Sequence, residues 1–158
     1  MPVAKLKELL DREKVKYVTI SHSMAYTAQE IAAAAHIPGK EIAKTVMVKL
    51  DDRMVMAVLP ATARVELDRL REIAGAETVA LATEEDFKAL FPECATGAMP
   101  PFGGLYGMEL FADRSLAEDE EIAFNAGSHA ELIRMAYTDF ERLAQPKLAE
   151  FTAAPALA

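Results

Sequence analysis

Apolar residues alternate between helical spacing and short strand-like runs along the first third of the chain. Residues 4–14 carry leucines at helical intervals, and a β-type run at residues 17–20 follows. Thr27-Ala28-Gln29-Glu30 has the form of a capping box, and the Ala-rich stretch after it runs to His36 and stops at Pro38-Gly39. The pattern therefore predicts a helix, a strand and a second, short helix.

Two apolar runs in the middle of the chain predict a β-hairpin. Residues 44–50 and 53–59 flank Asp51-Asp52, a pair suited to a tight turn. Residues 54–59 are all apolar, which is typical of a strand covered on both faces. We therefore place this second strand centrally in a sheet.

The second half of the chain mixes short helices and strands around a loop rich in glycine and proline. Residues 97–107 hold four Gly and two Pro, and no regular element is predicted there. The other predicted elements are a helix at 65–74 closed by Gly75, strands at 78–81, 108–112, 121–126 and 131–136, a helix capped by Thr83-Glu84-Glu85-Asp86 and ending before Pro92, and a last helix capped by Thr138-Asp139 and ending near Leu143.

These elements predict an α+β fold for a single domain. Helices and strands are interspersed without a regular βαβ rhythm, so we expect a mixed sheet instead of a doubly wound one. A chain of 158 residues has the size of one compact domain. We assign residues 1–150 to that domain and expect a loose tail at residues 151–158.

Composition narrows the class of protein. The chain is 52% hydrophobic and 27% charged, which excludes a disordered or collagen-like protein. No apolar run approaches the roughly 20 residues that span a bilayer, and the charged amino terminus is unlike a signal peptide. We therefore expect a cytoplasmic protein with no membrane partner. The single cysteine, Cys94, excludes an internal disulfide and a thiolate-rich metal site.

The charge of the chain bears on nucleic-acid partners. A net charge of −8 argues against a general nucleic-acid coat protein, because neutralising phosphates needs clustered Lys and Arg, and DNA is not an expected partner. The charge is uneven, however, because residues 40–64 hold five basic and three acidic residues, whereas residues 109–121 hold six acidic residues and one Arg. A local basic face on an acidic protein is expected, formed by Lys40, Lys44, Lys49, Arg53 and Arg64.

Lys44 is the most informative single residue. With the strand period of two it shares a face with Val46 and Val48, while Thr45 and Met47 point the other way. A lysine on an apolar face is expected to line a pocket or its rim, since burying an unpaired ammonium is costly, and there it would contact an anion. The alternative is a lysine at the strand end that reaches solvent along its own stem.

Two loops carry the other candidate chemistry. The loop at residues 97–104 combines prolines with glycines that allow a ligand to approach the backbone, but it matches neither a P-loop nor a dinucleotide fingerprint. Gly127-Ser128-His129 lies between two predicted strands, where backbone N–H groups and an imidazole could meet a substrate. The alternatives are a rigid connection and a solvated histidine. No cofactor is expected.

Neither a metal site nor a nucleophilic triad is predicted. His22, His36 and His129 match no metal-ligand spacing, and no Gly-x-Ser-x-Gly elbow is present. Cys94 follows Glu93, whose carboxylate would raise the pKa of the thiol, so a half-buried packing role is favoured over a nucleophile.

Four segments, taken in order along the chain, resemble the YbaK/ProX family of aminoacyl-tRNA deacylases, which is related to the editing insertion of bacterial prolyl-tRNA synthetases. They are Thr27-Ala28-Gln29-Glu30, Ala43-Lys44-Thr45, residues 97–103 and Ala126-Gly127-Ser128-His129. The resemblance implies a mixed, mostly antiparallel, barrel-like sheet with surrounding helices. It also implies hydrolysis of wrongly charged tRNA, typically alanine or cysteine on proline tRNA. The implied partners are the 3′ acceptor end of aminoacyl-tRNA and an aminoacyl-tRNA synthetase.

Carried over by position, the resemblance implies roles for named residues. Lys44 would contact the 3′-terminal adenosine, residues 97–103 would shape the aminoacyl pocket with backbone groups, and His129 would line that pocket. An activated ester needs little more than a positioned water and loop N–H groups facing the oxyanion. The catalytic candidates are Lys44, Gly97, Ala98, Gly127 and Ser128, and the substrate-binding candidates are His22, Thr45, Met99, Pro100, Pro101, Phe102, Gly103 and His129.

Two other functions stay open at this point. The first is a binding module that holds a small ligand or an RNA 3′ end in the same pocket without turnover. The second is a hydrolase of small esters or amides that uses Cys94 or His129. Release of the amino acid from charged tRNA separates these from a deacylase.

Overall fold

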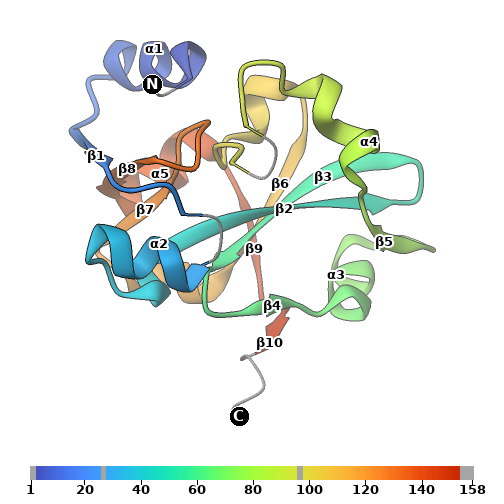
Figure 1. Cartoon of the computed structure of the whole chain (residues 1–158). Helices are drawn as coiled ribbons and strands as arrows, with labels where there is room; N and C mark the ends of the chain where they lie inside the picture. Colours follow the sequence, from blue (N-terminus) through green and yellow to red (C-terminus); the bar gives the residue numbers. More distant parts are fainter. Residues whose placement is uncertain (1–2, 26–27, 96–97, 154–158) are drawn as a thin grey trace.

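The computed structural model describes residues 3–25, 28–95 and 98–153, the side chains of residues 28 and 29 excepted (Figure 1). Its helices are α1 (Ala4–Arg12), α2 (Ala28–Ala35), α3 (Leu67–Ala74), α4 (Glu84–Phe87) and α5 (Tyr137–Ala144), with 3₁₀ helices η1 (Gly39–Glu41), η2 (Lys88–Leu90), η3 (Gly103–Tyr106) and η4 (Arg114–Glu118). Its strands are β1 (Tyr17–Ser21), β2 (Ile42–Leu50), β3 (Arg53–Pro60), β4 (Arg64–Val65), β5 (Val79–Leu81), β6 (Glu109–Asp113), β7 (Glu121–Asn125), β8 (Glu131–Ala136), β9 (Lys147–Ala149) and β10 (Thr152–Ala153).

Eight of these strands form one mixed sheet in the order β1-β8-β7-β2-β3-β6-β9, and β5 pairs with β2 off this path. The pairs β1–β8, β8–β7, β2–β3 and β2–β5 are antiparallel, whereas β7–β2, β3–β6 and β6–β9 are parallel. The predicted α+β class with a mixed, mostly antiparallel sheet is confirmed. Within the described ranges β1 and β9 do not pair with each other, so the barrel-like sheet is not closed.

The predicted hairpin is the centre of this sheet. β2 and β3 pair from Ala43–Pro60 to Leu50–Arg53, and the turn places Asp51 at a φ of 54°. Aspartate tolerates this left-handed conformation better than most residues. The Asp51 carboxylate also accepts hydrogen bonds from the N–H groups of Glu77 and Thr78, both at 3.0 Å. β3 lies between β2 and β6, which confirms its central place.

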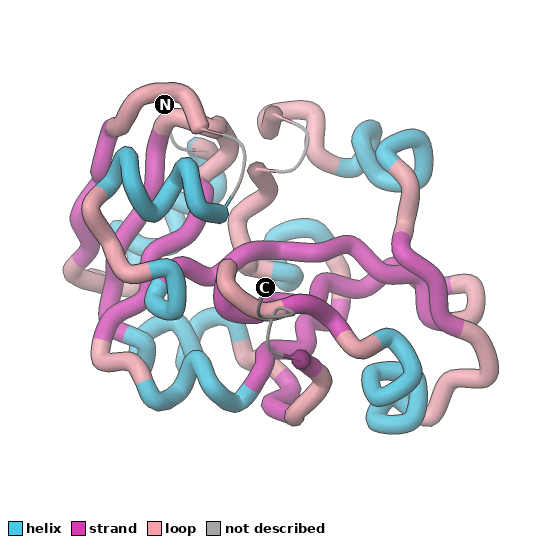
Figure 2. Tube along the Cα trace, turned by 60° about the horizontal axis from the view of Figure 1, so that its bottom comes forward, coloured by secondary structure: helices cyan, strands magenta, loops and turns pink. Residues whose placement is uncertain are grey.

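The strand period of two gives the sheet two differently covered faces. The first face carries Met47, Met56 and Phe124 and packs against α1, α4, α5 and the Gly-Pro loop in the largest core cluster. The second face carries two smaller clusters, one around Val48 under α3 and one around Ile42 under α2. Figure 2 shows the helices around the outside of the strands. In the part of the chain described, no helix is both long and apolar enough to cross a membrane.

The capping predictions have different outcomes. The cap predicted at Thr83 is confirmed and takes the form of a capping box, because its hydroxyl accepts from the N–H of Asp86 at 3.3 Å and the Asp86 carboxylate accepts from the N–H of Thr83 at 2.8 Å. The capping box at Thr27 lies outside the described residues. The cap predicted at Thr138-Asp139 is wrong, because α5 begins at Tyr137 and its N-cap is Ala136, without a side-chain hydrogen bond.

The predicted start of α3 and the loose tail also need correction. Residues 64–65 form β4 and pair with β10, so the helix predicted from residue 65 begins at Leu67. Phe151 is fully buried; its N–H donates to Asp113 Oδ1 at 3.2 Å and its carbonyl accepts from the N–H of Glu66 at 2.7 Å. The expectation of a loose tail is therefore wrong for residues 151–153. These residues are held by the buried ring of Phe151 and by the pairing of β10 with β4.

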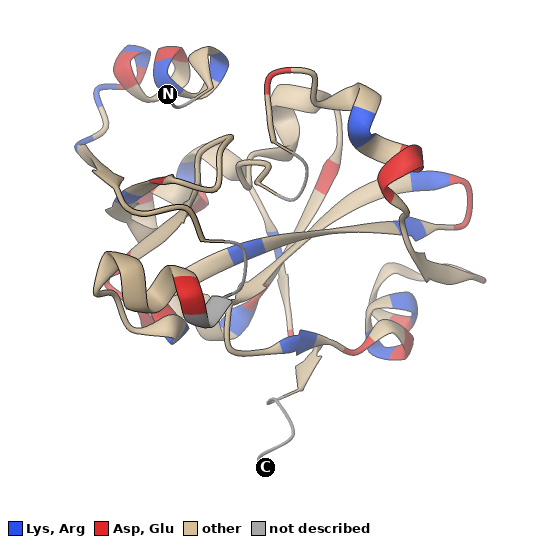
Figure 3. Cartoon of the chain, in the orientation of Figure 1, with Lys and Arg blue, Asp and Glu red and all other residues tan. Residues whose placement is uncertain are grey.

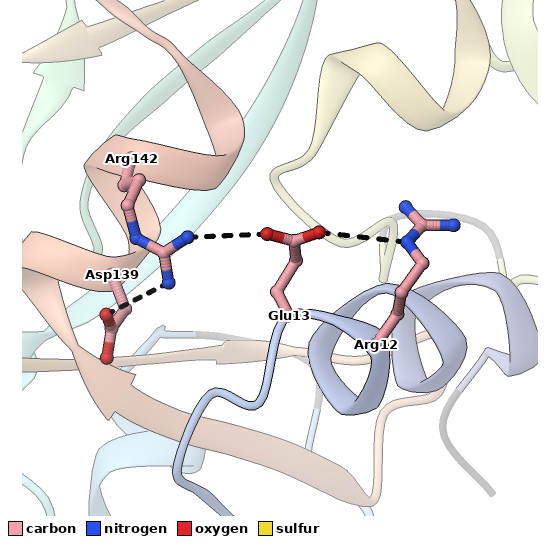
Figure 4. A network of polar contacts seen from close by, with 4 residues as sticks. All are labelled: Arg12, Glu13, Asp139 and Arg142. Atoms are coloured by element: carbon pink, nitrogen blue, oxygen red, sulfur yellow. Dashed lines mark hydrogen bonds and ion pairs between the residues drawn. The ribbon is translucent and has the colours of Figure 1, made fainter.

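A surface network ties the end of α1 to α5 (Figure 4). The guanidinium of Arg142 donates to Glu13 Oε1 and to Asp139 Oδ1, both at 3.4 Å, and Arg12 lies 3.8 Å from the other oxygen of Glu13. All four side chains are partly or well exposed to solvent. We expect this network to contribute little, because solvent screens such pairs.

Candidate functional site

The Gly-Pro loop and the Gly-Ser-His loop lie side by side. The N–H of Ala95 donates to the carbonyl of Gly127 at 2.7 Å, and the N–H of Gly127 donates to the carbonyl of Ala98 at 2.9 Å. The carbonyl of Ala126 in turn accepts from the N–H of Val3 at 2.8 Å. The structure therefore brings together two segments that the sequence singled out separately.

Gly127 is required by the backbone at this junction. Its φ is 112°, a conformation that L side chains rarely adopt, and a Cβ at this position would lie 2.5 Å from Cγ2 of Val3. The glycine thus allows the N-terminal segment to pack directly on the loop. Gly97, the other glycine among the catalytic candidates, lies outside the described residues.

The backbone hydrogen bonds limit the proposed oxyanion role of these loops. The N–H of Ala98 donates to the carbonyl of Ala95 at 3.0 Å, and the N–H of Gly127 is used by Ala98. The hydroxyl of Ser128 accepts from the N–H of Ala130 at 3.3 Å, which stabilises the turn. An oxyanion-donor role for Ala98 and Gly127 is not supported, because their N–H groups already have partners.

The side chains of the Gly-Pro loop belong to the core. Residues 98–103, including Pro100 and Pro101, are all buried. Met99 and Phe102 join the first-face cluster, and the ring of Phe102 lies 5.6 Å from those of Phe124 and Phe140. At Gly103 a Cβ would overlap the carbonyl oxygen of Met108. These side chains stabilise the loop, so a contact with substrate would fall to its backbone.

Lys44 lies on the second face of the sheet, as the pattern predicts. It pairs with Leu59 across the hairpin, is half-buried, and its Nζ donates to the carbonyl of Ala61 at 3.4 Å. Desolvation by burial lowers the pKa of Lys44, since burial disfavours the charged form. Thr45 pairs with Val58, whose side chain belongs to the first-face cluster. The structure therefore separates Thr45 from Lys44 instead of placing both at one site.

Asn125 lies beside Lys44 and was missed by the sequence reasoning. β2 and β7 run parallel and pair at Ile42–Ala123 and Ala43–Phe124. Lys44 and Asn125 are the residues that directly follow the second pair, one on each strand. Ile42 and Ala123 belong to one core cluster on the second face. Lys44 and Asn125 lie two residues further along the same strands, so their side chains are on that face too. The Oδ1 atom of Asn125 is buried and has no hydrogen-bond partner within the described ranges. The sequence signal that could have identified Asn125 is its place as a single polar residue directly after the apolar run Ile122–Phe124.

His22 reaches the same face from the end of β1. Its N–H donates to the carbonyl of Ala130 at 2.9 Å, which continues the β1–β8 register beyond Ser21–Glu131. Its Nδ1 lies 2.7 Å from the carbonyl of Ser23, and because a carbonyl only accepts, Nδ1 carries a proton. In the neutral ring Nε2 is then an acceptor. It is buried and unpartnered among the residues described.

His129 is half-buried and adjoins the segment that follows His22. Its carbonyl accepts from the N–H of Ala25 at 3.1 Å. Four polar residues on three segments of the chain, His22, Lys44, Asn125 and His129, therefore lie toward the same end of the sheet. We call the first three, which lie on the second face, the polar end.

The predicted basic face is divided by the fold (Figure 3). Lys49 lies on the opposite face of β2 from Lys44 and forms an ion pair with Asp86 at 2.9 Å. The N–H of Thr83 and the ammonium of Lys49 lower the pKa of Asp86 to about 2. Arg53 pairs with Glu109 at 3.0 Å. Lys49 and Arg53 are thus each paired with a carboxylate, and Lys49 does not share the face of Lys44.

Cys94 has the packing role that the sequence favours. It is half-buried against the first-face cluster, with its sulfur 3.8 Å from the hydroxyl of Tyr106. Burial raises the pKa of the Cys94 thiol, which disfavours the nucleophilic thiolate. Across residues 3–25, 28–95 and 98–153, no three His, Cys, Asp or Glu side chains are grouped so as to hold a metal ion.

Two solved structures share this fold. A candidate trans-editing enzyme for prolyl tRNA synthetase matches with a TM-score of 0.81 and 20% sequence identity, covering 95% of this chain and 96% of that one. A hypothetical protein matches with a TM-score of 0.84 and 20% identity, covering 94% and 99%. At this identity the likeness establishes the fold.

Comparison of sequences identifies the family. The chain is 28% identical over 152 residues to the multifunctional Ser/Thr-tRNA deacylase ProXp-y of Escherichia coli (strain K12), covering 93% of this chain and 90% of that protein. It is 27% identical over 89 residues to a proline–tRNA ligase of Bacillus cereus (strain AH187), covering 56% of this chain and 16% of the ligase. The family model for the aminoacyl-tRNA editing domain matches residues 22–143, a range that includes His22, Lys44, Asn125 and His129. The chain therefore belongs to the aminoacyl-tRNA editing domain family, hydrolases that act on aminoacyl-tRNA.

Proposed function

We propose that this protein is a cytoplasmic trans-editing deacylase that removes a small, wrongly attached amino acid from the 3′ end of tRNA. The family match over residues 22–143 carries the proposal. The resemblance noted in the sequence favours alanine or cysteine as the amino acid, and the E. coli relative, named a Ser/Thr-tRNA deacylase, adds serine and threonine. An aminoacyl-tRNA synthetase would supply the wrongly charged tRNA.

The reaction in this proposal is ester hydrolysis. Water attacks the carbonyl carbon, the bond between that carbon and the ribose oxygen breaks, and the ribose oxygen takes up a proton as the free amino acid leaves. Lys44 supports this chemistry because it is half-buried and, among the described residues, its ammonium makes a single long hydrogen bond, to the Ala61 carbonyl. The N–H groups of Ala98 and Gly127 already donate to backbone carbonyls. We therefore assign to Lys44 the contact with the terminal nucleotide and the stabilisation of the negative charge that develops on the ester oxygens.

Single-turnover release of labelled amino acid tests the proposal. The panel contains tRNAs charged with alanine, cysteine, serine, threonine and proline, and the proteins are wild type, Lys44→Ala and Lys49→Ala. We expect Lys44→Ala to slow release about 100-fold, the usual effect of removing one charge-stabilising donor. Lys49→Ala is the matched control, because this lysine lies on the same strand, faces the other way and is paired with Asp86.

The outcomes separate the candidate functions. Selective release that depends on Lys44 supports the deacylase and names its substrate. Binding of charged tRNA without release from any member of the panel would instead identify a binding module. Equal rates for wild type and Lys44→Ala would remove Lys44 from the mechanism.

A further inference from the structure

We infer that Asn125 accepts a hydrogen bond from a side-chain hydroxyl of the amino acid being removed, so that the site selects hydroxylated residues over alanine. The inference deepens the proposed function and rests on it. It concerns a residue to which neither the sequence patterns nor the resemblance gives a role.

The position of Asn125 places its amide at the polar end. Asn125 and Lys44 directly follow the last parallel β2–β7 pair, Ala43–Phe124. Both side chains are on the second face of the sheet. Neighbouring strands lie about 4.8 Å apart, so adjacent side chains on one face are in reach of the same small ligand. Asn125 is thus beside the cation that we assign to the terminal nucleotide.

Asn125 and His22 each present a buried acceptor without a donor. Oδ1 of Asn125 has no hydrogen-bond partner among the described residues, and neither has Nε2 of His22. The proton on Nδ1 of His22, held by the Ser23 carbonyl, fixes Nε2 as the acceptor of the neutral ring. Buried acceptors in native proteins normally have partners. We assign these two atoms to donors on the substrate.

An aminoacyl ester carries an α-ammonium group, and serine and threonine add a hydroxyl. An ammonium placed at Asn125 would be repelled by the neighbouring charge of Lys44, whereas a neutral hydroxyl would not. His22 reaches the polar end from β1, which is separated from β2 by β8 and β7, and it suits the ammonium better. We therefore assign the hydroxyl to Asn125 and the ammonium to His22.

This arrangement gives selectivity through an unmet hydrogen bond. When the substrate is alanine, Oδ1 of Asn125 stays buried without a donor, and leaving such a group unpaired is costly. A site that hydrogen-bonds a substrate hydroxyl discriminates strongly against an analogue without the hydroxyl. An apolar pocket discriminates much less between two substrates that differ only in size. Cysteine gains less than serine, since a thiol is a weak donor.

Binding of stable amide analogues tests the inference without catalysis. The probes are 3′-deoxyadenosines that carry seryl, 2-aminobutyryl or alanyl groups through a 3′ amide, where 2-aminobutyryl matches seryl in shape but lacks the hydroxyl. We expect wild type to bind the seryl probe about 10- to 100-fold more tightly than the 2-aminobutyryl probe. Asn125→Ala should bring this ratio close to one, and Asn125→Asp, which keeps an oxygen at this position, should preserve a preference for seryl.

The result also distinguishes this inference from the proposed function. Equal wild-type affinity for the seryl and 2-aminobutyryl probes would overturn the role of Asn125, even if wild type releases amino acids from tRNA. An Asn125→Ala variant that keeps the wild-type ratio would do the same. A wild type that neither binds the probes nor releases any amino acid would overturn both. The comparison of the two probes on wild type stands even if Asn125→Ala fails to fold.

Discussion

The first face of the sheet and the polar end of the second face are built from the same strands but have opposite character. On the first face, Met47, Phe102 and Phe124 meet in one continuous apolar cluster. On the second face, two apolar clusters leave an end where Lys44 and Asn125 stand side by side. At this end, Oδ1 of Asn125 and Nε2 of His22 have no hydrogen-bond partner among the residues that the structure describes.

This contrast shows how a small domain separates stability from function. Apolar packing requires only complementary shape, so the first face holds the loops in place. Unpaired acceptors and a desolvated ammonium cost stability, and they persist where a ligand completes them. Substitutions on the two faces should therefore act on different properties of the protein.

The largest expected effect comes from breaking the first face with Phe102→Ala. The ring is fully buried between Phe124 and Phe140, and its removal should lower the free energy of unfolding by about 3–5 kcal/mol. Urea unfolding measures the loss. The control Leu90→Ala, at a side chain 45% exposed, should change it by no more than about 0.5 kcal/mol. A small effect of Phe102→Ala would contradict its place in the core.

A smaller loss is expected where the two loops join. Gly127→Ala puts a Cβ against Val3 at a φ of 112°, and we expect it to lower the free energy of unfolding by about 1–3 kcal/mol. Gly104→Ala is the matched control, since a Cβ there meets nothing within 4 Å and the backbone does not require glycine. Equal stability of the two variants in thermal unfolding would argue against the close contact with Val3.

The polar end should respond differently, and pH sharpens the comparison. Burial lowers the pKa of Lys44, so the folded state binds this proton less tightly than the unfolded chain does. Stability attributable to Lys44 therefore rises with pH between the folded pKa and the ordinary value of 10.5. At pH 7 the free energy of unfolding of Lys44→Met should equal that of wild type or exceed it by up to about 1 kcal/mol.

The difference between Lys44→Met and wild type should narrow as the pH rises toward 10.5. Urea midpoints of both proteins at pH 7 and pH 10 measure this difference. A Lys44→Met protein that is markedly less stable than wild type at pH 7 would show that the ammonium stabilises the fold.

The smallest effect is expected at the surface, away from both regions. Glu13→Ala removes the contacts to Arg142 and Arg12 and should lower the free energy of unfolding by no more than about 0.5 kcal/mol. Screening by 0.5 M NaCl should remove most of this difference. A loss comparable to that of Phe102→Ala would mean that the network holds α1 in place.

Local patterns predicted most of the elements. The hairpin at Asp51-Asp52 and the capping box at Thr83 follow from a few neighbouring residues, so short-range chemistry is enough to find them. β4, β9 and β10 were not predicted, because each is only two or three residues long and exists through pairing with a distant segment. Phe151 appeared to begin a loose tail for the same reason.

The candidate site divides in the same way. Period two in β2 predicted the face of Lys44, and it also predicted that Thr45 points away. Sequence could not reveal that the N–H of Gly127 is used by Ala98, since the two residues are far apart along the chain. Asn125 was overlooked because its importance depends on Lys44 beside it in another strand.

The sequence by itself determined the element pattern, the lone cation on an apolar strand face and the two unusual loops, because each is encoded by residues close together in the chain. Only the tertiary structure decided which polar residues share a face of the sheet. The parallel pairing of β2 with β7 places Asn125 beside Lys44, and the β1–β8 register brings His22 to the same face. Hydrogen-bond partners of buried atoms are set by contacts between distant segments, and such contacts form only when the sheet is assembled.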